Sequence, residues 1–412
     1  MRVFLLPSWC PTVDTPLSGT FFVEQAHALA RLRSHWSIAI CLFDLARSRV
    51  PWRPSQMSRF AHDFAQRPRV SHEIAASGLH VYQVWKPYLP RWGARKKWQA
   101  TVMALSAQAR PALAQFTTAG GKPDLIHALA SYPAGGAAAI LGRESRIPFG
   151  ITEHLGPFPP HTLQMADGRP MAVIDDAYAA ATGLSAVSRS LAEQILRWRL
   201  APHVDVLPNF LDDDFGAAAL ADDRRAPGFS FLSVGGPSQE KGTGNLLRAL
   251  ALSRGGARLQ IVGDGVQRPE FQRLAVALGI ADRVSWLGAT TRENMPNVYA
   301  ASDAVVLASQ SETFGVVLIE ALACGKPLIA TRCGGPLDIV RPANGLLVPV
   351  DDAASLAAAM DRMQESVGQY AAQALHADFL QRFSASAAVD GIERWYGMLR
   401  ERGSAGAQEQ DA

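Results

Sequence analysis

Two glutamates in the second half of the chain, Glu312 and Glu320, stand eight residues apart and flank a stretch that predicts the start of a helix. Apart from Glu320, residues 316–324 are apolar, and Gly325 follows them, which predicts a short buried helix. Free backbone N–H groups at residues 314–316 would point at an anion, and the helix dipole would add to them. Carboxylates on either side suit a ligand with a phosphate in its middle and hydroxyl groups at its ends. Taken alone, a plain helix-start carboxylate explains Glu312 equally well.

The elements around these glutamates place them at one edge of a predicted sheet. Strands are predicted at residues 304–307 and 326–331, so Glu312 falls on a strand-to-helix loop, where open α/β sheets bind ligands. A glycine-rich loop at residues 234–242 follows another predicted strand and contains Lys241. This loop lacks the Gly-Lys-Ser/Thr order of a nucleoside-triphosphate P-loop. Its lysine suits a diphosphate as a point charge.

The first half of the chain offers two further candidates. Gly19 lies between a strand predicted at residues 2–6 and a helix predicted at residues 21–33, where a glycine lets the backbone approach a phosphate. A plain turn glycine is the alternative. His154 follows a strand predicted at residues 149–153 and so lies at a carboxyl end as well. A structural hydrogen bond is the more common role of a lone histidine.

The alternation of strands and helices predicts the fold class. At 412 residues the chain is too long for one hydrophobic core, so two domains are expected. Strands and helices alternate in the second half at the spacing of right-handed crossovers, which predicts a parallel sheet. The expected class is α/β, with two Rossmann-like, doubly wound parallel-sheet domains. The strands predicted in the second half are residues 229–234, 259–262, 284–287, 304–307 and 326–331.

The domain limits follow from a polar, irregular segment that begins at Pro208 and predicts a linker. We predict an N-terminal domain at residues 1–208 and a second domain at residues 209–384. A helix at residues 385–402 is expected to return to the first domain. The polar residues 403–412 are predicted to be disordered.

The charges are distributed unevenly along the chain. Residues 1–208 hold 22 Lys and Arg against 13 Asp and Glu, whereas the remainder holds 18 against 24, so the first half should face an anionic partner. Residues 47–97 contain eleven basic and two acidic residues, interleaved with aromatic ones. Amphipathic aromatics beside cations suit an anionic membrane surface. A solvated basic face with packed tryptophans is the second interpretation, and nucleic-acid binding is the third. The candidate membrane-contact residues are Trp85, Trp92, Arg95, Lys96, Lys97 and Trp98.

Other sequence features argue against a membrane span and a metal site. The chain has no apolar run of about 18 residues and no signal-peptide pattern, so a cytoplasmic protein is expected. Three consecutive aspartates at residues 212–214 lie in the linker and are interpreted as a solvated turn. The cysteines lack metal-ligand spacing and are interpreted as buried thiols in a reducing compartment. They are Cys10, Cys41, Cys324 and Cys333.

An ordered series of motifs resembles the retaining GT-B glycosyltransferases of the fourth sequence family, over nearly the whole chain. Each motif is weak alone, but the ordered set is specific. The resemblance implies two Rossmann-like domains that face each other across a cleft, with a nucleotide-sugar held mainly by the second. The matching pieces are Gly19, Thr152-Glu153-His154, residues 186–191, Leu207-Pro208-Asn209, residues 234–242, 261–265 and 286–288, Ser302-Asp303, Glu312 with Glu320, and residues 344–348.

The resemblance also implies residue roles. Glu320 would hold the ribose hydroxyls and Lys241 the diphosphate of the donor. Glu312 and His154 would act at the donor sugar. Cations and helix amides would stabilise the leaving diphosphate, so neither a metal nor another cofactor is expected. The backbone amides that would complete the phosphate cradle are those of Gly19, Phe314, Gly315 and Val316.

One position departs from the family pattern. Gly236 stands where the family usually has an arginine that shares the diphosphate. Arg268 and Arg292 are candidate substitutes. A more weakly bound donor is the second explanation, and a catalytically silent homologue is the third.

The implied function is transfer of a hexose, with retention, from a UDP- or GDP-linked sugar to a glycan or lipid-linked acceptor in the synthesis of a bacterial surface polysaccharide or exopolysaccharide. The first domain would bind the acceptor. We expect a cytoplasmic enzyme, peripheral on the inner face of the cytoplasmic membrane, that binds no nucleic acid. One alternative is a nucleotide-sugar 2-epimerase on the same fold, against which the spacing of Glu312 and Glu320 argues. The other is a non-catalytic glycosyltransferase-like partner protein, which Gly236 would explain.

Overall fold

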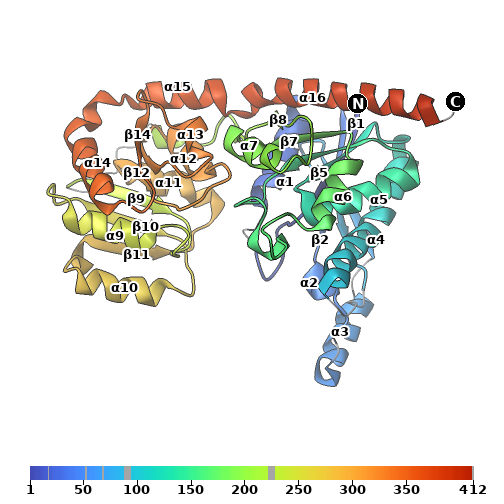
Figure 1. The fold of residues 1–412 in the computed structure, drawn as a ribbon, viewed down its shortest axis with the longest axis horizontal. Helices are drawn as coiled ribbons and strands as arrows, with labels where there is room; N and C mark the ends of the chain where they lie inside the picture. Colours follow the sequence, from blue (N-terminus) through green and yellow to red (C-terminus); the bar gives the residue numbers. More distant parts are fainter. Residues whose placement is uncertain (17, 52, 67–68, 88–93, 221–227, 411–412) are drawn as a thin grey trace. The chain divides into compact units, whose positions relative to one another are not determined.

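The computed structural model describes residues 1–412 except 17, 52, 67–68, 88–93, 221–227 and 411–412 (Figure 1). The described chain forms two compact units. The main passage from one unit to the other lies between Leu207 and Pro208, at the end of the predicted first domain. Unit 1 contains Met1–Val187, Ala192–Leu207 and Val389–Ala412, and unit 2 contains Ser188–Leu191 and Pro208–Ala388.

Unit 1 is built on an eight-stranded sheet in the order β3-β4-β2-β1-β5-β6-β7-β8. Neighbouring strands are parallel except β3 and β4, which are antiparallel. In the centre, Val3 on β1 pairs with Ile38 on one side and Leu125 on the other. The central strands are buried along almost their whole length, as in a parallel sheet covered on both faces. The strands are β1 Arg2–Pro7, β2 Ser37–Phe43, β3 Val70–Ile74, β4 His80–Val84, β5 Leu125–Leu129, β6 Phe149–Glu153, β7 Gly183–Ala186 and β8 Asp205–Val206.

Helices connect these strands and bury apolar faces against the sheet. In α1, the side chains of Phe22, Ala26 and Leu29 recur at helical spacing and are buried. A π-helical turn at Ser131–Gly135 joins β5 to α5. The helices that follow strands of this sheet are α1 Thr20–Leu32, α2 Leu45–Ser48, α3 Pro54–Gln66, α4 Ala94–Gly120, α5 Gly136–Ser145, α6 Ala172–Ala180 and α7 Arg189–Arg197.

Unit 2 contains a six-stranded sheet in the order β11-β10-β9-β12-β13-β14, with every neighbouring pair parallel. Its core includes Phe231, Leu259, Val306 and Ile329 from four adjacent strands. The predicted fold class, α/β with two parallel-sheet domains, is confirmed. The strands are β9 Ser230–Val234, β10 Arg258–Val262, β11 Val284–Gly288, β12 Ala304–Leu307, β13 Leu328–Thr331 and β14 Gly345–Val348. The helices are α8 Ala217–Leu220, α9 Thr243–Leu252, α10 Arg268–Ala277, α11 Met295–Ala300, α12 Val316–Ala323, α13 Pro336–Ile339, α14 Ala353–Ser366 and α15 Ala372–Arg382.

The last helix, α16 Ala385–Gln410, contributes residues to both units, and its part from Val389 onward belongs to unit 1. There, the Trp395 ring lies 5.1 Å from the His127 ring, and the Tyr396 hydroxyl is hydrogen-bonded to His127 Nδ1 at 2.8 Å. The helix continues to Gln410, so the predicted disorder from residue 403 is wrong for the described part of the chain.

The basic segment of the first half contains more regular structure than its sequence indicated. It includes β3 and β4, which extend the unit 1 sheet on one side. Trp85 is 6% exposed and packs against Phe60 with ring centroids 5.8 Å apart, so its assignment to a membrane surface is wrong. Trp98 is half-buried against the Tyr132 ring. Trp92 lies outside the described residues, as do the side chains of Arg95, Lys96 and Lys97. In the part of the chain that is described, no helix is long and apolar enough to cross a membrane.

Candidate functional site

Glu312 and Lys241 form an ion pair at the carboxyl edge of the unit 2 sheet. The Lys241 ammonium donates to Glu312 Oε1 at 2.6 Å, and the Ser309 hydroxyl donates to the same oxygen at 2.8 Å. The Glu312 side chain is 13% exposed, whereas that of Lys241 is 40% exposed. The lysine therefore remains accessible to an anion from solvent while the carboxylate holds it in place.

Backbone hydrogen bonds fix the loops that carry this pair. The Glu312 N–H donates to the Cys333 carbonyl at 2.9 Å, and the Gly335 N–H donates to the Glu312 carbonyl at 2.9 Å, which ties the loop after β12 to the loop after β13. The Gln310 N–H donates to the Glu240 carbonyl at 2.8 Å, which ties the same loop to the one after β9. Three strand ends therefore share one rigid edge, at the place where open parallel sheets bind ligands.

Glu320 is held in the interior of the same unit. It is 5% exposed, accepts a hydrogen bond at Oε2 from the Tyr299 hydroxyl at 2.6 Å, and pairs through Oε1 with the Arg292 guanidinium. Arg292 also lies over the Phe215 ring, 4.3 Å from its centroid. Burial raises the pKa of Tyr299 well above its ordinary value, and the nearby Glu320 carboxylate adds to the rise. Tyr299 therefore stays a hydrogen-bond donor to Glu320 at neutral pH.

The start of α12 lies between these two carboxylates in the chain. The helix begins at Val316 after Gly315, and the first amides of a helix have no acceptor within it. The Phe314 side chain is 1% exposed and packs edge-on against Phe383 at 6.0 Å. Residues 314–316 can therefore meet a ligand through backbone N–H groups, with the positive end of the helix dipole behind them.

Gly236 stands in a position without room for a side chain. A Cβ at this residue would lie 2.5 Å from the Asp264 carbonyl oxygen on the loop after β10. Of the two candidate substitutes for an arginine here, Arg292 is committed to buried Glu320. Arg268 is 26% exposed, and its guanidinium lies 3.6 Å from the exposed carboxylate of Asp264 and 3.2 Å from the Trp286 carbonyl oxygen. Arg268 is therefore the cation on the neighbouring loop that an anion could recruit.

Gly19 and His154 lie in unit 1. Gly19 precedes α1 with a φ of 68°, and a Cβ there would meet the Trp9 carbonyl oxygen at 2.6 Å, so only glycine fits. His154 is 8% exposed and packs edge-on against Phe22 at 4.8 Å. Burial lowers the pKa of His154 to about 3, and its Nε2 has no hydrogen-bond partner among the described residues. The imidazole is therefore neutral and retains an unused polar atom.

Glu153 received no role of its own from the sequence, and the structure shows that it organises the loop of His154. Its carboxylate accepts hydrogen bonds from the Tyr178 hydroxyl at 2.6 Å and the Ser131 N–H at 3.2 Å. It also accepts from the N–H groups of His154 and Leu155, each at 2.8 Å. The sequence signal for a role of Glu153 was its place beside His154 in a motif. The four hydrogen-bond donors to its carboxylate are revealed only by the packing.

The cysteines are free thiols, three of them buried, and Cys333 is partly exposed. Burial raises the pKa of Cys333 to about 11, and the Glu312 carboxylate adds to this. In the described part of the chain, no group of three or more His, Cys, Asp or Glu side chains could hold a metal ion.

Comparison with known proteins identifies the fold and then the domains. The two parallel-sheet units form a GT-B fold, which solved glycosyltransferase structures share over almost the whole chain. Residues 18–209 match the family described as "Glycosyl transferase 4-like domain", and residues 224–374 match the family described as "Glycosyl transferases group 1". The chain therefore matches two glycosyltransferase domains in this order, over residues 18–209 and 224–374.

Individual relatives cover less of the chain. The D-inositol 3-phosphate glycosyltransferase of Mycobacteroides abscessus is 37% identical over 177 residues, which are 42% of this chain and 34% of that protein. The chain thus spans about a third of the length of this relative. Anabaena HepE, solved in complex with UDP and with UDP-glucose, has a TM-score of 0.68 in the first complex, at 21% identity over 96% of this chain and 100% of its own. The lipopolysaccharide outer core galactosyltransferase WaaB has a TM-score of 0.61 at 17% identity, over 95% of this chain and 98% of its own.

Proposed function

We propose that this protein is a retaining glycosyltransferase that moves a hexose from a UDP- or GDP-linked sugar to a glycan or a lipid-linked acceptor. The observation that carries the proposal is the pair of carboxylates on either side of the start of α12, Glu312 and Glu320, each joined to a cation. The two glycosyltransferase domains support it, as do the UDP and UDP-glucose complexes of HepE.

In this proposal the donor diphosphate lies at the start of α12. The amides of residues 314–316 and the Lys241 ammonium would neutralise it. Glu320 would accept hydrogen bonds from the ribose, because a carboxylate offers roughly four acceptor sites and Tyr299 and Arg292 use only part of them. Negative charge grows on the diphosphate as the bond to the sugar breaks, and cations placed beforehand stabilise it. The proposal therefore requires no metal and no other cofactor.

Glu312 and His154 act at the donor sugar in this proposal. The ion pair with Lys241 and the bond from Ser309 both use Glu312 Oε1, and Oε2 would accept from a sugar hydroxyl. His154 is neutral because burial lowers its pKa, so its Nε2 suits an uncharged hydroxyl group. The backbone of Gly19 would complete the phosphate cradle.

We place the enzyme in the cytoplasm, on the inner face of the membrane, in the synthesis of a surface polysaccharide. The excess of cations in the first half supports this placement, as does the shared fold with the lipopolysaccharide galactosyltransferase WaaB. The protein should pellet with anionic liposomes at moderate salt. Equal pelleting by a variant in which the basic and aromatic candidates are replaced would contradict membrane contact. That variant replaces Trp92, Lys96, Lys97 and Trp98.

The donor can be found by screening nucleotide-sugars for thermal stabilisation, since a ligand at about 100 times its Kd adds about 2.7 kcal/mol. The anomeric configuration of the product, followed by NMR with that donor, should equal that of the donor. Lys241→Ala and Glu312→Ala should each lower transfer by about 100-fold or more, because each removes charge from the site. Glu365→Gln, at an exposed position on α14, is the control and should leave transfer unchanged.

Three outcomes of these measurements would contradict the proposal. Unchanged transfer in both alanine variants would show that the site lies elsewhere. Epimerised donor formed without any acceptor would establish the 2-epimerase. Calorimetry that detects no binding of UDP or GDP would favour the non-catalytic partner protein.

A further inference from the structure

A cavity in unit 1 is lined by part of the loop between β1 and α1. It has a volume of about 560 Å³, within the range of roughly 300–1,000 Å³ found for small-molecule sites. Its walls are the loop after β1, from Pro11 to Pro16, and the ends of β2 and β4. Ser71 on β3 completes the rim. The cavity therefore lies at the carboxyl ends of parallel strands, the edge of an open α/β sheet where ligands bind.

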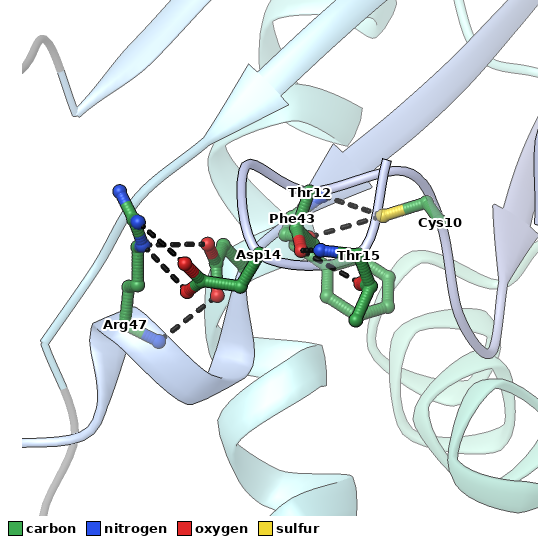
Figure 2. A network of polar contacts seen from close by, with 7 residues as sticks. Cys10, Thr12, Asp14, Thr15, Phe43 and Arg47 are labelled. Carbon is green, nitrogen blue, oxygen red and sulfur yellow. Dashed lines mark hydrogen bonds and ion pairs between the residues drawn. The ribbon is translucent and has the colours of Figure 1, made fainter. Parts of the chain in front are cut away.

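Figure 2 shows the polar contacts of the β1 loop, which lines this cavity. The Cys10 thiol donates to the Phe43 carbonyl at 3.0 Å, and the hydroxyl groups of Thr12 and Thr15 are 2.8 Å apart. Arg47 donates to both carboxylate oxygens of Asp14, at 2.7 and 2.9 Å. The loop is thus anchored to the end of β2 through Cys10 and to α2 through Asp14, which holds this wall of the cavity in place before any ligand arrives and lowers the cost of binding.

The walls combine apolar surface with a few uncharged polar groups. Leu42, Val84 and the prolines of the loop supply the apolar part. Ser71 and Gln83 pair directly across β3 and β4, are exposed, and supply a hydroxyl and an amide on one face. This composition, apolar walls with a few placed polar groups, is that of a small-molecule site.

The charge on the walls of the cavity is that of a carboxylate. Among its described lining residues, only Asp44 is charged, and its Oδ1 accepts from the Arg47 N–H at 2.9 Å. The nearby Arg47 guanidinium is bidentate with Asp14 and also lies 3.8 Å from Asp44 Oδ2, so the two carboxylates share it. A phosphate here would face the Asp44 carboxylate, and the described lining residues include no cation to bind it, whereas sugar hydroxyls can donate to that carboxylate.

We propose that this cavity binds the acceptor and that the acceptor is a neutral glycoside with an apolar aglycone. Sugar hydroxyls contact Asp44, Gln83 and Ser71, and the aglycone lies against Leu42, Val84 and the loop prolines. The proposal rests on the proposed glycosyltransferase function. It distinguishes this chain from the relatives named for D-inositol 3-phosphate, whose name indicates a phosphorylated polyol.

The test uses the full chain labelled with 5-fluorotryptophan, because Trp85 lines the cavity. Trp85→Phe assigns its ¹⁹F resonance among those of the nine tryptophans. Titration with 4-nitrophenyl α- and β-hexosides should shift the Trp85 resonance saturably. Gln83→Arg should weaken that binding about tenfold or more, equivalent to about 1.4 kcal/mol. Gln115→Arg, the same change at an exposed position on α4, should leave it unaltered.

Further titrations of the same labelled protein also test whether the cavity binds a neutral glycoside. Inositol 3-phosphate should shift the Trp85 resonance only at much higher concentration than the hexosides, and tighter binding of this anion would overturn the proposal. Equal binding of 4-nitrophenol without a sugar, or equal hexoside binding by Gln83→Arg, would overturn it as well. UDP binding, measured on the same samples by calorimetry, reports separately on the proposed function. Loss of UDP binding with intact hexoside binding would therefore reject the transferase and not the cavity.

Discussion

Glu320 offers the sharpest test of the donor site, because its carboxylate has both a structural and a proposed binding role. Glu320→Gln keeps the shape of the side chain and removes its charge. Hydrogen bonds to a charged group contribute about 1.5–3 kcal/mol, against about 1 kcal/mol for neutral ones. The contacts to Tyr299 and Arg292 should therefore weaken, and the free energy of unfolding should fall by about 1–2 kcal/mol. Glu320→Ala removes the buried carboxylate that pairs with Arg292, which is 23% exposed, and should cost about 2–4 kcal/mol.

The binding effect must be separated from this loss of stability. If the ribose hydroxyls donate to the carboxylate, Glu320→Gln should weaken UDP binding about 5- to 30-fold, the equivalent of about 1–2 kcal/mol. Calorimetric titration with UDP at a temperature where both variants are folded measures this, and urea unfolding gives the stability. Glu365→Gln serves as the charge-matched control. A Kd for UDP within about twofold of the native value, with stability lowered as expected, would show that Glu320 is structural only.

Three further changes test other parts of the site. Gly236→Arg should lower stability by about 1–3 kcal/mol in urea unfolding and should not improve UDP affinity, because its Cβ would strike the Asp264 carbonyl; tighter UDP binding would contradict this. Arg268→Gln should weaken UDP binding about tenfold and reduce its salt dependence if this cation serves the diphosphate, whereas an unchanged Kd would exclude that role. His154 has a pKa of about 3 when folded and about 6.5 when unfolded, so the unfolded chain binds the extra proton between these values and stability falls as pH drops through them. Between pH 7 and pH 5 this amounts to about 2 kcal/mol, so His154→Gln should lose that much less stability than the native chain over the same interval, and equal losses would contradict the assignment.

The sequence predicted unit 2 well because its elements are short, strongly apolar and separated by glycine-rich loops. Glu312, the start of α12 and Glu320 lie in one continuous stretch, so their order along the chain already places them together. The ion-pair partners were harder to foresee. Arg292 lies on the 3-10 turn before α11 and meets Glu320 on α12 through tertiary folding, which no local pattern encodes.

In unit 1, the spacing of apolar residues along the chain predicted less of the structure. β3 is an antiparallel edge strand with mostly exposed residues, so its sequence has little apolar alternation. The prediction for this region therefore followed the surrounding basic residues and not a strand pattern. The basic charge of that region suggested a surface for Trp85, yet the residue faces the interior against Phe60. Glu153 and the cavity beside Asp44 depend on contacts between segments far apart in sequence, which composition does not reveal.

The position of α16 sets the order in which the two units can be completed during synthesis. All strands of the unit 1 sheet have been synthesised once residue 207 is reached. The part of α16 that supplies Trp395 and Tyr396 is synthesised only after every strand of unit 2. At roughly 5–20 residues per second, about 10–40 seconds separate these events. Throughout that interval the apolar surface around His127 lacks its cover, while every strand of unit 2 is produced. The unit encoded second is therefore the first that can finish folding.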